Sequence, residues 1–324
     1  MLKRVFTYGV VFMLFLLLAQ KSKAQQMTLH NQYLVNPYTI SPAMAGYNFR
    51  SQVFIGYRKQ WANIPESPQT SFASIVLPSF KRVWLGLSVI SDQTSIYKYF
   101  KASLSYTYEL PITENHFFRF SLWGNLHQNT INLENVHVAD ADDPLLRNKS
   151  RLVGTALNAG AGFVYQNRRL VLGLSVPDVF VNKDKYAVDS DKNLLVIERR
   201  LLAFGYYKYY LSDKWMIRPG MIYRTTKNSP ASYDIFAVFK YMNTYWVGLI
   251  YRKESIIGIS IGGHLLNDFT LNYSYEFMNN GFAGYTSGTH EITIGFNLKT
   301  PATRTGGEFR YYPMILEYNQ RYRR

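Results

Sequence analysis

Residues 101–110 read KASLSYTYEL, and residues 117–128 read FFRFSLWGNLHQ. Polar and apolar side chains alternate in both stretches, so a β-strand would carry them on opposite faces. The charged residues Lys101, Glu109 and Arg119 all fall on the polar face. A strand with lipid on one side and a polar interior on the other has this pattern. The two stretches therefore predict neighbouring strands of an antiparallel transmembrane β-barrel.

Comparable alternation recurs along most of the chain. It predicts 14 strands, at 52–61, 69–77, 82–91, 97–110, 117–129, 155–166, 169–176, 200–211, 214–224, 232–241, 244–252, 255–263, 268–278 and 287–298. Most of these segments reach the roughly 9 to 11 residues that a tilted strand needs to cross a membrane. An even number is typical of bacterial outer-membrane barrels. Pro219 interrupts one expected strand and predicts a β-bulge there.

Short and long connections between these strands alternate along the chain. Short ones are expected at 78–81, 111–116, 167–168, 212–213, 242–243 and 265–267, and long ones at 62–68, 130–154, 177–199, 225–231 and 279–286. The short connection near Lys253 departs from the rule. Outer-membrane barrels have short periplasmic turns and long extracellular loops, so the sequence predicts the same arrangement here.

The amino terminus has the features of a cleaved signal peptide. Lys3 and Arg4 precede an apolar stretch at 5–19, and Ser22 and Ala24 place small residues at minus three and minus one of a cut before Gln25. An uncleaved anchoring helix is the alternative, but the stretch is shorter than the roughly 20 residues of a membrane span. The expected organisation is a signal peptide at 1–24, a periplasmic lead-in or lumen plug at 25–50, an outer-membrane barrel at 51–299 and a basic periplasmic tail at 300–324.

Composition restricts the chemistry of the chain. There is no cysteine, which excludes disulfides and thiolate sites, and no cofactor is expected. The formal net charge is +15, and removing Lys3, Arg4, Lys21 and Lys23 with the signal leaves +11. A basic balance can indicate nucleic acid, but here the charges are scattered over strands and loops of an exported protein. We therefore expect no nucleic-acid partner.

Two patterns raise the question of catalysis or metal binding. Residues 258–262 read GISIG, a literal G-x-S-x-G, but a nucleophile elbow needs a strand, a sharp turn and a helix, and this motif lies inside an alternating run. Ser260 with His264 also lacks an acid to orient the base. Asp140, Asp142 and Asp143 cluster in a long loop. Their carboxylates could bind a calcium ion or could simply be solvated. The favoured expectation is a non-enzymatic protein without a resident metal.

The amino-terminal stretch resembles a known family. Residues 32–47 read QYLVNPYTISPAMAGY and residues 57–70 read YRKQWANIPESPQT, and both are similar to the opening signature of the PorP/SprF family of type IX secretion membrane proteins, apart from Ser41, where Asn is usual. GLSV at 86–89, GLSVPDVF at 173–180 and SGTHEI at 287–292 resemble later strands of that family. The resemblance implies an outer-membrane protein of the Bacteroidota lineage that supports protein export and often surface adhesins and gliding motility.

The signature supplies the candidate contact residues. Asn36, Pro37, Pro42 and Gly46 disfavour a regular strand and are expected to contact the barrel or partners. Arg58, Gln60 and Trp61 close the first expected strand; Arg58 and Gln60 would point inward and hold residues 36–46 against the wall. Trp61 could share that role or could act as an anchor at the membrane interface; the sequence leaves both alternatives open. Arg321, Arg323 and Arg324 end the basic tail, which could approach an acidic periplasmic partner or anionic lipid headgroups.

The resulting expectation is an outer-membrane component of type IX secretion. Its implied partners are the secretion machinery, including periplasmic ring lipoproteins, together with exported adhesin cargo and outer-membrane lipid. A diffusion porin for small solutes is the main alternative, and an outer-membrane hydrolase is a lesser one. Steady ion conductance would favour the porin, whereas lumen aromatics such as Trp123 favour a closed barrel.

Overall fold

A computed structural model describes residues 30–80, 82–133, 151–180, 182–184, 195–226, 229–253, 255–265, 268–278 and 284–298. Among them no helix has the length and apolar character to cross a membrane. The strands are β1 (Ser51–Lys59), β2 (Gln69–Pro78), β3 (Val83–Thr94), β4 (Tyr97–Thr113), β5 (His116–Asn132), β6 (Arg151–Gln166), β7 (Leu170–Val176), β8 (Asn182–Asp184), β9 (Leu195–Ile197), β10 (Arg200–Tyr207), β11 (Tyr209–Tyr210), β12 (Trp215–Thr226), β13 (Ser229–Tyr241), β14 (Tyr245–Arg252), β15 (Ile256–Leu265), β16 (Phe269–Met278) and β17 (Thr289–Leu298).

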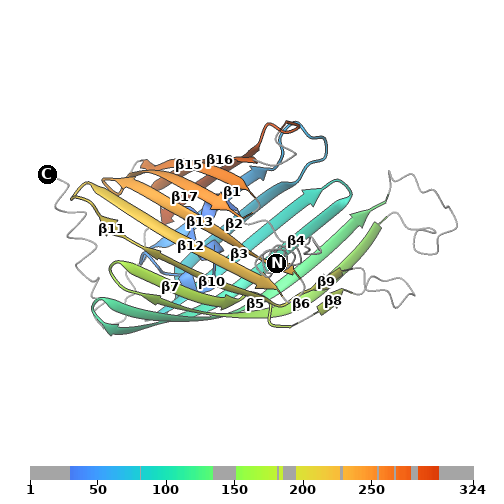
Figure 1. Cartoon of the computed structure of the whole chain (residues 1–324). Helices are drawn as coiled ribbons and strands as arrows, with labels where there is room; N and C mark the ends of the chain where they lie inside the picture. The colour runs from blue at the N-terminus through green and yellow to red at the C-terminus, as the bar shows by residue number, and fades with distance from the viewer. Residues whose placement is uncertain are drawn as a thin grey trace, which may run out of the picture.

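The main sheet closes on itself as an antiparallel barrel (Figure 1). Neighbours along the chain pair with one another, and β1 pairs with β17, from Ser51 opposite Leu298 to Lys59 opposite His290. The second join is made by β10, which pairs with both β7 and β12. The two-residue β11 continues β10 along β12. The barrel therefore has 14 strand positions, which confirms the predicted fold and strand number.

Side chains alternate between lipid and lumen as the sequence predicts. On β5, Leu122 is 66% exposed on the outer face, whereas Arg119 and Trp123 point inward and are 0% and 5% exposed. On β17, Glu291 and Thr293 are buried inside, and Ile292 is 43% exposed outside. Because lipid would cover the outer face, the exposed apolar side chains are the expected membrane surface.

Connection length differs between the two ends of the barrel. At one end, on the left in Figure 1, strands that follow one another in the chain are joined by short turns, such as 167–169 or 211–214; we call this the short-turn end. The opposite, long-loop end carries the connections after β1, β5, β7 and β16. Some connections there are shorter than expected. β12 runs to Thr226 and β13 begins at Ser229, and only Ser95 and Ile96 join β3 to β4.

Pro219 does not produce the expected bulge. The pairs Tyr206 with Gly220 and Tyr209 with Ile217 keep one register, and Pro219 still lies opposite Ala237 on β13. The hydrogen-bond ladder to β12 is instead interrupted opposite Pro219, where β10 gives way to β11. Proline has no N–H to donate, so a backbone hydrogen bond is missing there. No extra residue is inserted, as a β-bulge would require.

Aromatic side chains of the lumen lie over glycines of neighbouring strands. The cross-strand pairs are Phe54–Gly295, Phe72–Gly56, Trp123–Gly160, Phe204–Gly173, Phe236–Gly220 and Trp246–Gly262. A Cβ built on Gly56 would lie only 1.9 Å from the Phe72 ring. Each glycine thus leaves space for a ring packed flat on the inner wall, which adds an apolar lining to a lumen expected to be mainly polar.

Candidate functional site in the barrel lumen

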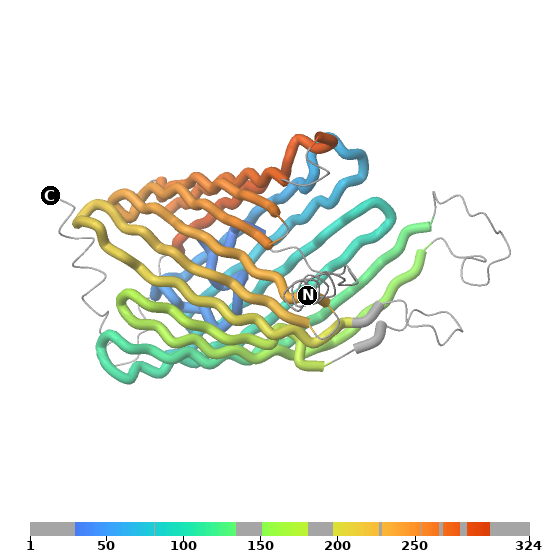
Figure 2. The backbone as a smooth tube through the Cα atoms, viewed as in Figure 1, coloured from blue at the N-terminus to red at the C-terminus, as the bar shows by residue number. Residues whose placement is uncertain are grey.

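Residues 30–50, which we call the lumenal segment, lie inside the barrel (blue in Figure 2). The segment forms three short 3₁₀ turns, η1 (Asn31–Leu34), η2 (Pro37–Thr39) and η3 (Pro42–Met44). Proline begins η2 and η3, where its missing N–H costs nothing, and the Ser41 hydroxyl accepts a hydrogen bond from the Ala43 N–H. Turns this short are not stable alone, so contacts with the wall must hold them.

Polar groups of four strands bind the segment at successive positions. The contacts are Asn36 Nδ2 to Ser74 Oγ (2.9 Å), Tyr38 Oη to Ser105 Oγ (2.9 Å), Ser175 Oγ to Ser41 Oγ (2.6 Å), Thr107 Oγ1 to the Pro42 carbonyl (3.0 Å) and Arg119 Nη2 to the Gly46 carbonyl (3.4 Å). Their wall residues belong to β2, β4, β5 and β7. The signature residues Asn36, Pro42 and Gly46 therefore all lie at contacts between the segment and the wall.

Gly46 is required by its backbone and by its surroundings. Its φ is +71°, a conformation that L side chains rarely adopt, and a Cβ would lie 2.2 Å from the Trp84 ring. Arg119, which contacts its carbonyl, is paired with Glu109 at 2.6 Å. This glycine allows the chain to leave the lumen and enter β1.

Apolar packing completes the attachment. Tyr33, Leu34, Ile40 and Met44 of the segment are at most 6% exposed and belong to one core with wall residues such as Phe236. Burying a large apolar side chain contributes about 1.5–3 kcal/mol. The lumen thus has a hydrophobic core of its own, which alternation along the strands did not reveal.

A chain of buried ion pairs crosses the lumen near the long-loop end; we call it the ion-pair network. Its members alternate in charge, and the contacts are Arg224–Asp234 (2.6 Å), Asp234–Arg252 (3.1 Å), Arg252–Glu276 (3.1 Å), Glu276–Arg58 (2.6 Å) and Arg58–Glu291 (3.1 Å). Three guanidinium groups thus face three carboxylates. Buried charges are tolerated when paired in this way.

Glu291 connects the network to the lumenal segment. Its carboxylate accepts hydrogen bonds from the backbone N–H groups of Asn31 (3.0 Å) and Gln32 (2.6 Å). These are the first two residues of η1, whose N–H groups have no partner inside the turn. Arg58 orients the same carboxylate. The wall therefore holds the beginning of the segment through a charged group.

The residues singled out in the first strand have different positions. Arg58 points inward and is 1% exposed, and it reaches the segment through Glu291 at residues 31–32 rather than at 36–46. Gln60 and Trp61 lie beyond β1, which ends at Lys59. The Gln60 N–H bonds the Pro68 carbonyl, and the Trp61 N–H bonds Thr289 Oγ1. Both thus help to shape the loop after β1.

Other expected features fall outside the described residues. These are the signal peptide at 1–24, the loop carboxylates Asp140, Asp142 and Asp143, and the tail with Arg321, Arg323 and Arg324. The connection expected as loop at 177–199 carries the small two-stranded sheet of β8 and β9. Within the described part of the chain, no group of His, Asp and Glu is arranged to hold a metal ion.

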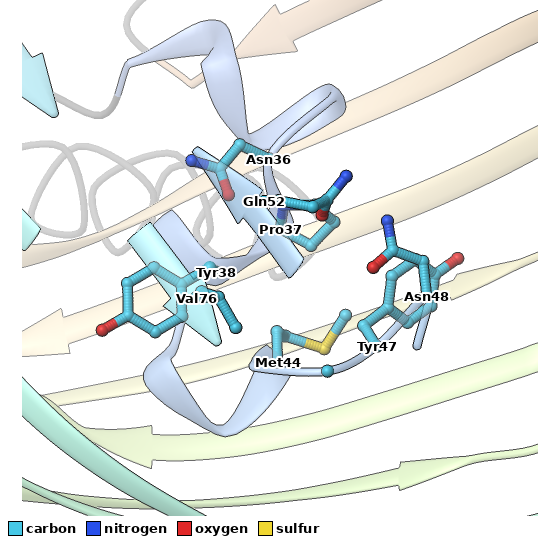
Figure 3. Close-up of a pocket in the computed structure, with 9 residues that line it drawn as sticks. Asn36, Pro37, Tyr38, Met44, Tyr47, Asn48, Gln52 and Val76 are labelled. Atoms are coloured by element: carbon cyan, nitrogen blue, oxygen red, sulfur yellow. The ribbon is translucent and has the colours of Figure 1, made fainter. Parts of the chain in front are cut away.

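A small pocket opens beside the lumenal segment (Figure 3). Asn36, Pro37, Tyr38, Met44 and Tyr47 line it from the segment, and Gln52 and Val76 line it from the wall. Its volume of about 10 Å³ open to a water-sized sphere is room for about one water molecule. Pro37 therefore lies at a packing defect that is too small for a larger solute.

Asp178 ties the start of the connection after β7 into the lumen. It is 0% exposed, and its carboxylate contacts His127 Nε2 (3.0 Å) and Arg200 Nη2 (3.1 Å). Burial opposes ionisation, but the hydrogen bond from His127 and the charges of Lys101 and Arg200 hold the pKa of Asp178 below its usual value. Asp178 belongs to GLSVPDVF, so only the family resemblance pointed to this residue.

Comparison with known proteins agrees with this geometry. Residues 22–296 match the family described as type IX secretion system membrane protein PorP/SprF. The chain belongs to this family. As a PorP/SprF protein it is a membrane component of type IX secretion, and its barrel fold and family indicate an outer-membrane location. A search of curated protein sequences gave no match.

Solved structures similar to this PorP/SprF protein are outer-membrane barrels of low sequence identity. The P. putida toluene transporter TodX is 9% identical, with a TM-score of 0.51 over 80% of this chain and 92% of its own. The CymD monoaromatic hydrocarbon channel is 11% identical, with a TM-score of 0.50 over 84% of this chain and 94% of its own. At these identities the likeness concerns the fold alone.

The G-x-S-x-G pattern has a structural place in this PorP/SprF barrel. Gly258, Ser260 and Gly262 lie on β15, and the Ser260 hydroxyl is fully buried and donates to Asn272 Oδ1 at 2.8 Å. His264 bonds Thr270 Oγ1 at 2.9 Å. The motif therefore lies inside one continuous strand, without the strand, turn and helix of a nucleophile elbow.

Proposed function

We propose that this PorP/SprF barrel is a non-catalytic protein-binding component of type IX secretion. Its long-loop end would hold exported adhesin-like cargo at the cell surface, and its short-turn end and basic tail would contact the periplasmic machinery, including ring lipoproteins. A role in gliding motility would follow where the cargo is a motility adhesin.

The observation that supports this role most directly is the attachment of the lumenal segment. A segment bonded to β2, β4, β5, β7 and β17 occupies the space that a diffusion porin would leave open. The barrel is then better suited to be a rigid support than a conduit. Sites on a rigid scaffold with long loops favour protein recognition.

Cell-surface display tests the proposal. In a strain without this protein, the wild-type gene should restore secretion and surface attachment of the cargo. A variant in which a two-residue Asn-Gly turn joins Asn132 to Arg151 should fail, although these residues lie opposite each other in the β5–β6 hairpin and can be joined without moving the strands.

A second variant and a control separate the two ends. Deletion of 300–324 should impair secretion while the barrel remains in the outer membrane. Replacement of Leu122, on the lipid-facing side of β5, by Ile alters neither end of the barrel and should leave secretion normal. Normal display by both the loop variant and the tail deletion would refute the proposed contacts.

A further inference from the structure

Charge in the lumen is balanced at one end of the barrel and unbalanced at the other. Near the long-loop end, the ion-pair network matches three guanidinium groups with three carboxylates. Near the short-turn end, Arg119 has Glu109. Lys208, Arg218 and Lys240, by contrast, form no ion pair with a carboxylate in the described part of the chain. Three inward-facing basic side chains therefore lack a carboxylate partner.

The three cations lie on one patch of the inner wall. Lys208 is opposite Arg218, because the flanking pairs Tyr206–Gly220 and Tyr209–Ile217 fix the register of β10 and β11 on β12. On the next strand, Arg218 pairs with Val238, and Lys240 is two residues further on the same face. Such diagonal neighbours are about 7–8 Å apart, within reach of long side chains.

Each of the three basic side chains lies over an aromatic ring. The Lys208 ammonium lies 5.0 Å from the centre of the Tyr47 ring, the Arg218 guanidinium 5.1 Å from that of Tyr206, and the Lys240 ammonium 5.5 Å from that of Trp246. Since the Tyr47 and Tyr206 rings are themselves 6.1 Å apart, Lys208 and Arg218 lie beside the lumenal segment at Tyr47.

Arg218 is the most constrained of the three. It is 5% exposed and donates one hydrogen bond of 2.5 Å to the Leu34 carbonyl, but its buried Nε has no hydrogen-bond partner. A donor left unpaired in a buried site costs free energy. Lys208 and Lys240 are half-buried, so the patch remains open to solvent at its edge.

Tyr47 reports the positive potential of the patch. Burial by itself would raise the pKa of its phenol, but the charges of Lys208 and Arg218, together with hydrogen bonding by neighbouring side chains, hold that pKa below its usual value. A neutral phenol ordinarily ionises near pH 10. The cations therefore favour a negative charge at this position even in the absence of a ligand.

We propose that Lys208, Arg218 and Lys240 bind a carboxylate or phosphate group of a ligand that enters the lumen from the short-turn end. One such oxyanion can accept charge-assisted hydrogen bonds from two ammonium groups and from the free guanidinium donors. Its charge removes the repulsion among the three cations. The site is independent of the loops at the other end and of the cargo proposed to bind there.

Calorimetry on the detergent-solubilised full chain tests this site, with inorganic phosphate and acetate as separate probes. Wild-type protein should bind at least one of them saturably. Binding of phosphate alone identifies phosphate groups as the ligand chemistry, and binding of acetate alone identifies carboxylates. Lys208→Gln with Lys240→Gln should weaken binding by at least about tenfold, because each charge-assisted hydrogen bond contributes roughly that factor.

Lys253→Gln provides the matched control. Lys253 lies at the long-loop end and donates to the Ala231 carbonyl, so its replacement should leave the affinity within about twofold. Tyr47 gives a second readout that does not depend on folding of the double variant. The ultraviolet ionisation curve of wild type, with that of Tyr47→Phe subtracted, should move to higher pH when the probe binds. Absence of saturable binding by both probes would overturn the proposal, as would equal affinity in the double variant.

Discussion

Replacement of Glu291 by Gln tests whether the barrel wall fastens the beginning of the lumenal segment. The side chain keeps its shape, but one oxygen becomes an amide nitrogen. The carboxylate now accepts from the N–H groups of Asn31 and Gln32 and from Arg58. In the variant only one side-chain oxygen remains as an acceptor. The new amide NH₂ group is itself a donor, so it faces a backbone N–H with which it cannot form a hydrogen bond. We expect the segment to open locally, while the ion pair between Arg58 and Glu276 is retained.

The size of the effect follows from the bonds that are lost. A hydrogen bond to a charged group contributes about 1.5–3 kcal/mol, and one of the two N–H contacts loses its acceptor while the other loses the charge. A net loss of about 2–3 kcal/mol makes local opening about 30- to 150-fold more frequent. The global barrel should remain intact, since its strands are paired by backbone hydrogen bonds that the substitution does not touch.

Hydrogen exchange measured by mass spectrometry in detergent follows this opening directly. Peptides that cover residues 30–36 should exchange faster in Glu291→Gln, with β-strand peptides unchanged. Glu109→Gln is the matched control and should leave the exchange of residues 30–36 unchanged, because its partner Arg119 contacts the other end of the segment, at Gly46. Equal protection of residues 30–36 in wild type and Glu291→Gln would refute the inference that this carboxylate holds the segment.

Three further predictions concern the lumen, the wall and the G-x-S-x-G motif. Wild-type barrel in a planar bilayer should pass little steady current, and deletion of residues 30–47 should raise the conductance because the lumen is then emptied; a large steady current through the wild type would instead favour the porin. Gly56→Ala should lower the thermal unfolding temperature, because its Cβ would lie 1.9 Å from the Phe72 ring and overpacking costs about 1–3 kcal/mol; an unchanged melting curve would show that the ring moves freely. Ser260→Ala should lower the free energy of unfolding by about 1–3 kcal/mol, because the buried hydrogen bond to Asn272 is lost. An ester-hydrolysis assay should give the same rate for this variant and the wild type; an activity lost with the hydroxyl would contradict the structural role of Ser260.

The ion-pair network shows what could not be read from the sequence. Arg58 lies 218 residues from Glu276 and 233 from Glu291 along the chain, and β1 meets β17 only when the barrel closes. The expectation that Arg58 points inward needed only strand alternation. Its partners depend on the registers of several strands, and a change of one residue in any register would turn these side chains toward lipid.

The unbalanced cations show the same division. That Lys208, Arg218 and Lys240 face inward follows from alternation along their strands, but their common location depends on how β10, β11, β12 and β13 pair. The interruption opposite Pro219 was also visible in the sequence only as an irregularity. Whether it would add a residue or remove a bond was decided by the neighbouring strand.

The sequence by itself determined the barrel, its strand number and the side of the wall on which most residues lie. Lipid and lumen impose a two-residue period that each strand records locally, without reference to its neighbours. The tertiary structure alone decided what fills the lumen and what holds it. The contacts of Glu291 with Asn31 and Gln32, and of Tyr33 with the apolar wall, join residues far apart in the chain, and such contacts form only where the closed barrel brings its inner surface around the lumenal segment.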